Sequence, residues 1–222
     1  MIRNIIFDWS GTLVDDLPAV WLATNHVFAR GGLKGMSLEE FRREFCLPFE
    51  NFYKRHAKDI PLAQLEDWYH EIFPQIQDSI EPLPHARAFL DDCRSRGLRL
   101  FLLSSIHSFH YPKQAERTGF GGYFERVYIQ VMDKRNQIGE LLADNSLDPS
   151  ETMFIGDMPH DVETAKCGKV WSCAVLTGFT PLEQLRNSNP DLLVEHLGEL
   201  RDHIERGWPN VTSANVTAKQ RI

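Results

Sequence analysis

Five polar side chains follow short apolar runs in this 222-residue chain: Asp8, Ser104, Lys134, Asp157 and Asp161. In open α/β sheets ligands bind beyond the carboxyl ends of the strands, so we expect these residues to converge. Neighbouring carboxylates repel each other unless a divalent cation lies between them, and such hard oxygen ligands are typical of Mg²⁺. A lysine and a hydroxyl beside the cation would bind phosphate oxygens. The pattern therefore predicts phosphoryl transfer, in which Asp8 could attack phosphorus.

The elements that would position these residues alternate between strands and helices. Apolar runs predict five strands, at residues 3–7, 98–103, 126–131, 152–155 and 170–176. Helical spacing predicts a helix just before the second run, at 85–96. It also predicts one helix between each later pair of runs, at 111–118, 135–144 and 159–166. This order is typical of an α/β fold with a parallel sheet covered by helices on both faces. The segment 191–206 is expected to be moderately helical.

A block without strand patterns separates the first strand from the rest. Helical spacing and proline positions predict helices at 18–30, 37–45, 49–57 and 62–77. We therefore expect an all-helical unit over residues 17–80, inserted into an α/β core made of residues 1–16 and 81–208. Residues 209–222 are small, polar and non-periodic, and are expected to form a C-terminal tail.

Composition narrows the classes of partner. The chain has 24 basic and 31 acidic residues and a formal net charge of −7, which argues against nucleic acid as the main partner. No apolar stretch approaches the length of about 20 residues that spans a membrane, and no signal peptide is evident. We expect a cytoplasmic protein, a monomer or homodimer, that acts on a small anionic substrate and contacts no membrane. The four cysteines lack zinc-ligand spacing.

Four motifs together resemble the haloacid dehalogenase superfamily. They are the run Asp8-Trp-Ser-Gly-Thr-Leu-Val-Asp15, the pair Ser104-Ser105 after a strand, Lys134 at the start of a helix, and Gly-Asp157-Met-Pro-His-Asp161. The resemblance covers roughly residues 1–180. It implies a Rossmann-like core with a small helical cap, as in phosphoglycolate-phosphatase-like members. It also implies Mg²⁺ and, usually, hydrolysis of small phosphorylated metabolites through an aspartyl-phosphate.

The resemblance also implies roles for single residues. Asp8 would be the nucleophile, Thr12 would orient the phosphoryl group, and Ser104 and Lys134 would hold its oxygens. The metal ligands would be Asp8, the main-chain carbonyl of Ser10, Asp157 and Asp161. Substrate contacts are expected from Trp9 and Ser105, and from Arg42 or Arg55 in the cap, where either arginine could bind a second anionic group.

Ser10 departs from the family pattern. Most phosphatases of the family have an aspartate there, which protonates the leaving group and then activates water. General acid–base catalysis contributes about 10²–10⁴-fold, so a serine predicts a slow phosphatase, or one that recruits another group. The nearby titratable candidates are Asp15, Asp16, His107 and His160.

Two alternatives stay open at this point. Phosphonoacetaldehyde hydrolase, a relative with the same Asp-Trp start and an alanine at the position of Ser10, uses a cap lysine as a Schiff base. Lys54 and Lys58 lie in the corresponding region. The chain could also be a non-catalytic module that binds phosphate or protein, because a fold does not fix a function.

Overall fold

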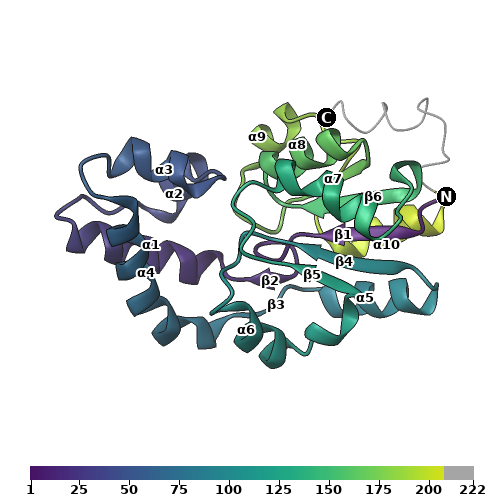
Figure 1. The fold of residues 1–222 in the computed structure, drawn as a ribbon, viewed down its shortest axis with the longest axis horizontal. Coiled ribbons are helices and arrows are strands. Elements are labelled where there is room, and N and C mark those ends of the chain that lie inside the picture. Colours follow the sequence, from purple (N-terminus) through teal and green to yellow (C-terminus); the bar gives the residue numbers. More distant parts are fainter. Residues whose placement is uncertain (208–222) are drawn as a thin grey trace.

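The computed structural model describes residues 1–207, and at its centre lies a sheet of parallel strands (Figure 1). Across the sheet the six strands are β5 (Arg126–Tyr128), β4 (Arg99–Leu103), β1 (Asn4–Phe7), β6 (Thr152–Gly156), β7 (Trp171–Val175) and β8 (Leu192–Val194). In the central strand, Phe7 lies opposite Leu102 of β4 and Ile155 of β6. The residues that follow these three strands therefore meet at the middle of one sheet edge. The expected α/β fold with a parallel sheet is confirmed.

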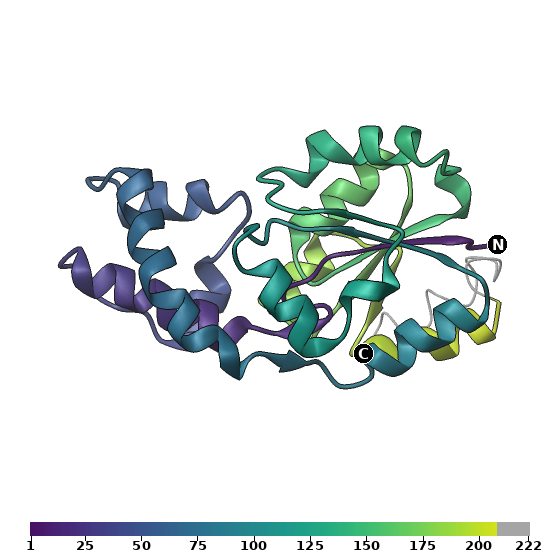
Figure 2. The ribbon, with the colours of Figure 1, turned by 60° about the horizontal axis from the view of Figure 1, so that its bottom comes forward.

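Both faces of the sheet are buried, which explains the continuous apolar runs. Ile5 and Phe7 pack into one hydrophobic core, whereas Ile6 between them packs into another. The first core is covered by α5 (Ala86–Ser95), α6 (Tyr111–Thr118) and α10 (Leu197–Glu205), and the opposite face by α7 (Lys134–Asp144), α8 (Pro159–Gly168) and α9 (Leu182–Asn187). Figure 2 shows the sheet between these two helical layers.

Four helices form a group beside the sheet (Figures 1 and 2): α1 (Leu17–Arg30), α2 (Leu38–Glu44), α3 (Phe49–His56) and α4 (Leu62–Ile76). Phe28, Phe41 and Phe52 are buried together in a further hydrophobic core, which also includes Met158 and Phe179 from the edge of the sheet. Ser37 begins α2 with a reciprocal capping box to Glu40, as the sequence predicts. These elements match the predicted helices. The division into a core and a cap at residues 17 and 80 stays a prediction, and the tail at 209–222 lies outside the described residues.

The structure differs from the expectations at the shortest elements. The segment expected to be helical at 191–206 contains the strand β8 before α10, because three residues are too few to show a period. The strand expected at 126–131 ends at Tyr128. A small antiparallel pair joins β2 (Val14–Asp15) to β3 (Glu81–Pro82), and its long-range pairing leaves no local signal. Short 3₁₀ turns occur at Gln77–Ser79, Gly121–Tyr123 and Pro149–Glu151.

Over residues 1–207, none of the helices combines the length and the apolar character that crossing a bilayer requires.

Candidate active site

Three carboxylates from separate elements converge at the sheet edge. Asp8 follows β1, Asp157 follows β6, and Asp161 lies in the first turn of α8. One oxygen of each lies within 4.8 Å of the others, and all three side chains are buried. Burial raises the pKa of Asp8 and of Asp157, and the neighbouring negative charges act in the same direction. Such a cluster requires positive charge close by.

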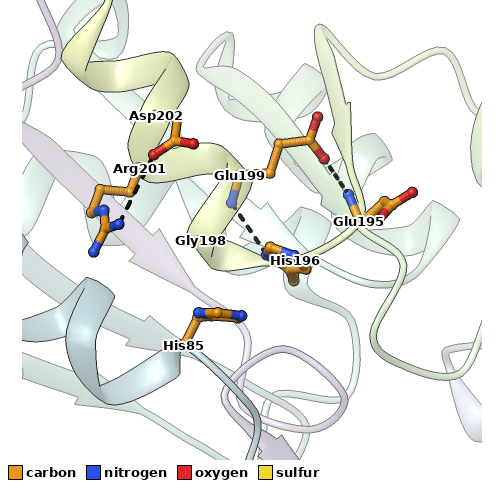
Figure 3. A pocket seen from close by; sticks show the side chains of 7 residues that line it. All are labelled: His85, Glu195, His196, Gly198, Glu199, Arg201 and Asp202. Carbon is orange, nitrogen blue, oxygen red and sulfur yellow. Dashed lines mark hydrogen bonds and ion pairs between the residues drawn. The ribbon is translucent and has the colours of Figure 1, made fainter.

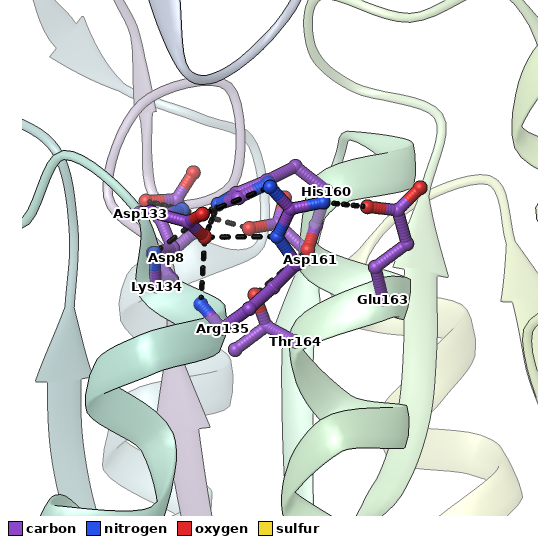
Figure 4. A network of polar contacts seen from close by, with 8 residues as sticks. All are labelled: Asp8, Asp133, Lys134, Arg135, His160, Asp161, Glu163 and Thr164. Atoms are coloured by element: carbon purple, nitrogen blue, oxygen red, sulfur yellow. Dashed lines mark hydrogen bonds and ion pairs between the residues drawn. The ribbon is translucent and has the colours of Figure 1, made fainter.

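Lys134 supplies one positive charge (Figure 4). Its Nζ lies 2.8 Å from Oδ1 of Asp8 and 2.7 Å from Oδ1 of Asp161, and its side chain is fully buried. Burial alone would disfavour the ammonium ion, but the carboxylates of Asp161 and Asp8 outweigh it and raise the pKa of Lys134 above its usual value. The lysine is therefore charged at neutral pH, and it links β1 to α8.

The start of α7 holds Lys134 in place. Asp133 is the N-cap residue, and its Oδ1 accepts a hydrogen bond of 3.1 Å from the backbone N–H of Arg135. The backbone N–H of Lys134 donates to Nε2 of His160, 3.2 Å away on α8. Burial lowers the pKa of His160 to about 4, so the ring is neutral and Nε2 can accept. His160 therefore positions the lysine, and it does not line the cavity above the carboxylates.

Asp157 is held by a loop that the sequence reasoning missed. The backbone N–H of Phe179 donates to Oδ2 of Asp157 at 2.7 Å. The hydroxyl of Thr177 donates to the carbonyl of Gly11 at 2.7 Å. A Cβ on Gly178 would lie 2.0 Å from Oδ2 of Asp157, so only glycine fits. Because this loop follows β7 at the same sheet edge, the strand-end rule could have found it.

Thr12 is brought to the same place by the turn after β1. Its side chain is fully buried, and its hydroxyl donates to Oδ1 of Asp157 at 3.3 Å. In this structure it therefore supports a carboxylate, and the predicted orientation of a phosphoryl group by Thr12 stays a prediction. Ser104 is also buried, at the end of β4, and its Oγ accepts from the N–H of Ile106 at 3.3 Å.

The donor set fits a divalent cation such as Mg²⁺. Three buried carboxylates face a single buried ammonium, which leaves negative charge uncompensated among the described residues of the cluster. The donors are all hard oxygen atoms, with no sulfur or imidazole among them. Asp8, Asp157 and Asp161 would hold the ion.

A cavity of about 420 Å³ opens above Asp8, between the sheet edge and the helices α1, α3 and α4. Of the predicted site residues, Asp8, Ser10 and Ser105 line it. Aromatic rings form much of its wall, namely Phe45, Phe49, Tyr53, Tyr69, Phe73 and Phe179. Polar groups include His70, His107, His110 and Gln114. The arrangement places the carboxylate of Asp8 at the surface of a largely aromatic cavity, with Lys134 and the other two carboxylates of the cluster beside it.

The expected substrate contact of Trp9 is wrong. The indole is fully buried, packs edge-on against Tyr111 and Phe120, and does not line the cavity. Its Nε1–H donates to Oε1 of Gln114 at 2.8 Å. Side chains alternate along an extended chain, and Trp9 lies on the same side of the sheet as Phe7. It orients Gln114, which does line the cavity.

The expected contacts of Arg42 and Arg55 are also not found at the cavity. The guanidinium of Arg42 points to the carbonyl of Phe179, at 3.4 Å from Nε. The guanidinium of Arg55 donates to the carbonyl of Glu44 at 2.6 Å. Neither arginine lines the cavity. Helical periodicity placed both on a helix but could not say which neighbours they would meet.

The cap lysines lie outside the cavity as well. Lys54 is exposed and pairs with Glu50 across one turn of α3, with 3.3 Å between Nζ and Oε2. Lys58 is exposed too, and neither lysine lines the cavity. The geometry therefore gives no support to a Schiff base at either position.

Two of the four candidate acid–base groups line the cavity, Asp16 and His107. Asp15 is exposed in β2, and His160 is bound to Lys134 as described. Burial raises the pKa of Asp16 to about 7, against the opposing hydrogen bond from Ser10. Its Oδ1 also accepts from the N–H of Gly11 at 3.2 Å.

Another hollow, of about 430 Å³, lies beside β8 and α10 (Figure 3). His85 and His196 stack there with ring centroids 4.4 Å apart. It shares no residue with the cavity above Asp8. His196 is engaged as the N-cap of α10, where Nδ1 accepts from the N–H of Glu199 at 3.2 Å. This hollow lacks the buried charge cluster of the site at Asp8.

Comparison with known proteins identifies the family to which this chain is similar. Residues 5–175 match the model of the haloacid dehalogenase-like hydrolase family. A phosphoglycolate phosphatase of Synechococcus elongatus is 28% identical over 209 residues, which cover 90% of this chain and 95% of that protein. A pyrophosphatase, PpaX, of Oceanobacillus iheyensis is 20% identical over 204 residues, which cover 90% of this chain and 95% of that protein. A crystal structure described as a predicted phosphatase from Clostridium acetobutylicum superposes with a TM-score of 0.83 at 18% identity, over 93% of this chain and 99% of that one.

Proposed function

The chain belongs to the haloacid dehalogenase-like hydrolase family, and from this premise we propose that it is a magnesium-dependent phosphatase of small phosphate monoesters. The observation that carries the proposal is the buried contact of Lys134 with Asp8 and Asp161 at the base of the cavity. The names of two relatives, a phosphoglycolate phosphatase and a pyrophosphatase, support the same class of reaction.

Asp8 is the proposed nucleophile, because it is the one member of the acidic cluster that lines the cavity. An oxygen of Asp8 bonds to phosphorus while the bond from phosphorus to the ester oxygen breaks, and the departing oxygen takes up a proton. Water then attacks the phosphorus of the aspartyl-phosphate, the bond to Asp8 breaks, and inorganic phosphate leaves. The ammonium of Lys134 acts to lower the pKa of Asp8, against the larger effect of burial, and with Ser104 it would bind phosphoryl oxygens.

Magnesium bound by Asp8, Asp157 and Asp161, with the carbonyl of Ser10, would neutralise charge on the phosphoryl oxygens. The chain itself contributes the fixed orientation of these ligands. Asp157 is locked by the N–H of Phe179, and Oδ2 of Asp161 accepts from the N–H of Met158 at 3.0 Å. Such preorganisation avoids the cost of arranging ligands during the reaction.

Ser10 sets the expected speed of the enzyme. A hydroxyl cannot exchange protons near pH 7 as a carboxylate can, so we propose slow turnover of esters whose leaving group needs a proton. Ser10 lines the cavity next to Asp8, which is where the missing carboxylate would act.

The test measures phosphate release from p-nitrophenyl phosphate with and without Mg²⁺, in the wild type and in Asp8→Asn. We expect metal-dependent turnover that falls by at least about a thousandfold in the variant. Asp144→Asn, an exposed change of the same kind at the end of α7, is the matched control. No turnover on a broad panel of phosphate esters would instead favour a non-catalytic binding module.

A further inference from the structure

The cavity above Asp8 has an unusual charge for an enzyme that acts on phosphates. Among the residues that line it, none is a lysine or an arginine. Glu66 and Asp67 of α4 contribute carboxylates to its wall, in addition to Asp8 and Asp16. Apart from the point at Asp8 where a phosphoryl group would bind, the wall of the cavity therefore combines carboxylates with aromatic rings.

The nearby cations are engaged elsewhere. Arg42 and Arg55 donate to backbone carbonyls, and Arg43 pairs with Glu39 at 2.7 Å on the surface of α2. Two histidines of the wall, His70 and His110, do not replace them, because burial lowers the pKa of His110 to about 4 and lowers that of His70 as well. Nδ1 of His70 lies 3.0 Å from Nε2 of His110, so one neutral ring donates to the other.

A substrate with a second anionic group would fit this wall poorly. A carboxylate placed close to Glu66 or Asp67 would be repelled by their like charge. A cationic group is attracted instead, both by these carboxylates and by the faces of aromatic rings. Tyr69 and Phe73, stacked with ring centroids 5.0 Å apart on α4, are part of this wall.

An unpartnered buried group points to a polar ligand in the same cavity. Gln114 lines the cavity and is 2% exposed. Its Oε1 is fixed by the indole N–H of Trp9, whereas its Nε2 has no hydrogen-bond partner among the described residues. A fixed amide N–H₂ without a partner is costly when buried. An ester or phosphoryl oxygen of a bound substrate would satisfy it.

We propose that this cavity selects phosphate monoesters of amino alcohols, in which a cationic nitrogen on a short carbon chain faces the aromatic and acidic wall. The inference rests on the proposed phosphatase function. It predicts a substrate preference unlike that of a phosphatase for phosphoglycolate, because the leaving group of phosphoglycolate carries a carboxylate. Glu66 and Asp67 attract the cation, the rings enclose it, and Gln114 donates to an oxygen of the ester.

The test compares phosphocholine and O-phosphoethanolamine with ethyl phosphate and 2-phosphoglycolate, using the full chain with Mg²⁺. We expect kcat/KM for the two cationic esters to exceed that for 2-phosphoglycolate at least about tenfold, mainly through KM. The double variant Glu66→Gln with Asp67→Asn should remove most of this ratio. Glu71→Gln is the matched control, because Glu71 lies on the same helix but pairs with Arg30 outside the cavity.

Binding to the Asp8→Asn variant, measured by calorimetry with the same four esters, separates this inference from the proposed function. If phosphocholine binds more tightly than 2-phosphoglycolate but the wild type hydrolyses none of the four esters, the proposed phosphatase function is wrong and the inferred selectivity stands. If the wild type hydrolyses the esters but kcat/KM for 2-phosphoglycolate equals or exceeds that for phosphocholine, the inferred selectivity is wrong and the proposed phosphatase function stands. A ratio that Glu71→Gln lowers as much as the double variant does would also overturn it.

Discussion

The ammonium of Lys134 lies 2.8 Å from the carboxylate of Asp8, and both side chains are buried. The two residues are far apart in the sequence and come from different elements, β1 and the first turn of α7. The contact forms because Asp8 follows a central strand and Lys134 is anchored by its backbone to His160. A lysine that a sequence pattern alone would place on the surface is thus the counter-charge of the proposed nucleophile.

Replacing Lys134 by methionine should destabilise the fold and stop turnover. Two buried carboxylates would lose their shared partner, and breaking a buried ion pair costs about 3–5 kcal/mol. Chemical denaturation in the absence of metal measures the loss. The control Lys113→Met removes a surface pair with Asp78, and should cost under about 1 kcal/mol. Equal losses in the two variants would contradict the role of Lys134.

Removing the metal should lower stability as well as activity. Mg²⁺ at about 100 times its dissociation constant stabilises a folded protein by about 2.7 kcal/mol. We expect EDTA to abolish this gain, and Asp157→Asn to lose it while still accepting from the N–H of Phe179. Thermal unfolding with and without Mg²⁺ is the measurement. A variant that keeps the full shift would exclude Asp157 as a ligand.

Introducing the missing carboxylate should speed the reaction. Ser10→Asp is expected to raise turnover of alkyl phosphates about ten- to hundredfold, since general acid–base catalysis is worth about 10²–10⁴-fold when optimally placed. The comparison is with Ser10→Asn, which has similar size and no titratable proton. If the aspartate variant folds, binds Mg²⁺ and is no faster than wild type, the explanation for Ser10 is incorrect.

A methyl group on Gly178 should damage the site more than the fold. The added Cβ would lie 2.0 Å from Oδ2 of Asp157, so the carboxylate must move. We expect Gly178→Ala to weaken Mg²⁺ binding and to lower kcat/KM at least about tenfold. Gly122→Ala is the control, because a Cβ there meets nothing within 4 Å. Unchanged metal affinity in Gly178→Ala would show that Asp157 tolerates the shift.

The pair of His70 and His110 should make stability depend on pH. Burial lowers the pKa of His110 to about 4 in the folded chain, against about 6.5 when unfolded. Between these values the unfolded chain binds a proton that the folded chain does not, so the free energy of unfolding falls as pH drops from 6.5 to 4. The loss is at most about 3 kcal/mol, as each pKa unit corresponds to about 1.4 kcal/mol.

The variant His110→Gln isolates this contribution. The other groups that face His110, chiefly His70 and His107, are present in both proteins, so their contributions largely cancel in the difference. Urea unfolding at several pH values should therefore show a shallower decline for the variant. Parallel curves for the two proteins would mean that His110 is not held neutral by its surroundings.

The sequence by itself determined the order of the longer strands and helices and the residues at the ends of those strands, whereas the short strands β2, β3 and β8 left no local signal. The apolar runs before Asp8 and Asp157 are continuous because both faces of the sheet are covered, and such runs are visible without a structure. Parallel strands bring their carboxyl ends to one edge, which is why Asp8, Lys134 and Asp157 could be expected together. The family resemblance added the roles, which remain proposals.

Only the tertiary structure decided which side chains face the cavity. Trp9 follows the nucleophile directly but turns into the core, and Arg42 reaches the carbonyl of Phe179 instead of a substrate. Gln114, from a helix with no motif, takes a place at the wall. The reason is physical: local periodicity fixes the face of an element, whereas the partner of that face depends on long-range packing that no short stretch of sequence encodes.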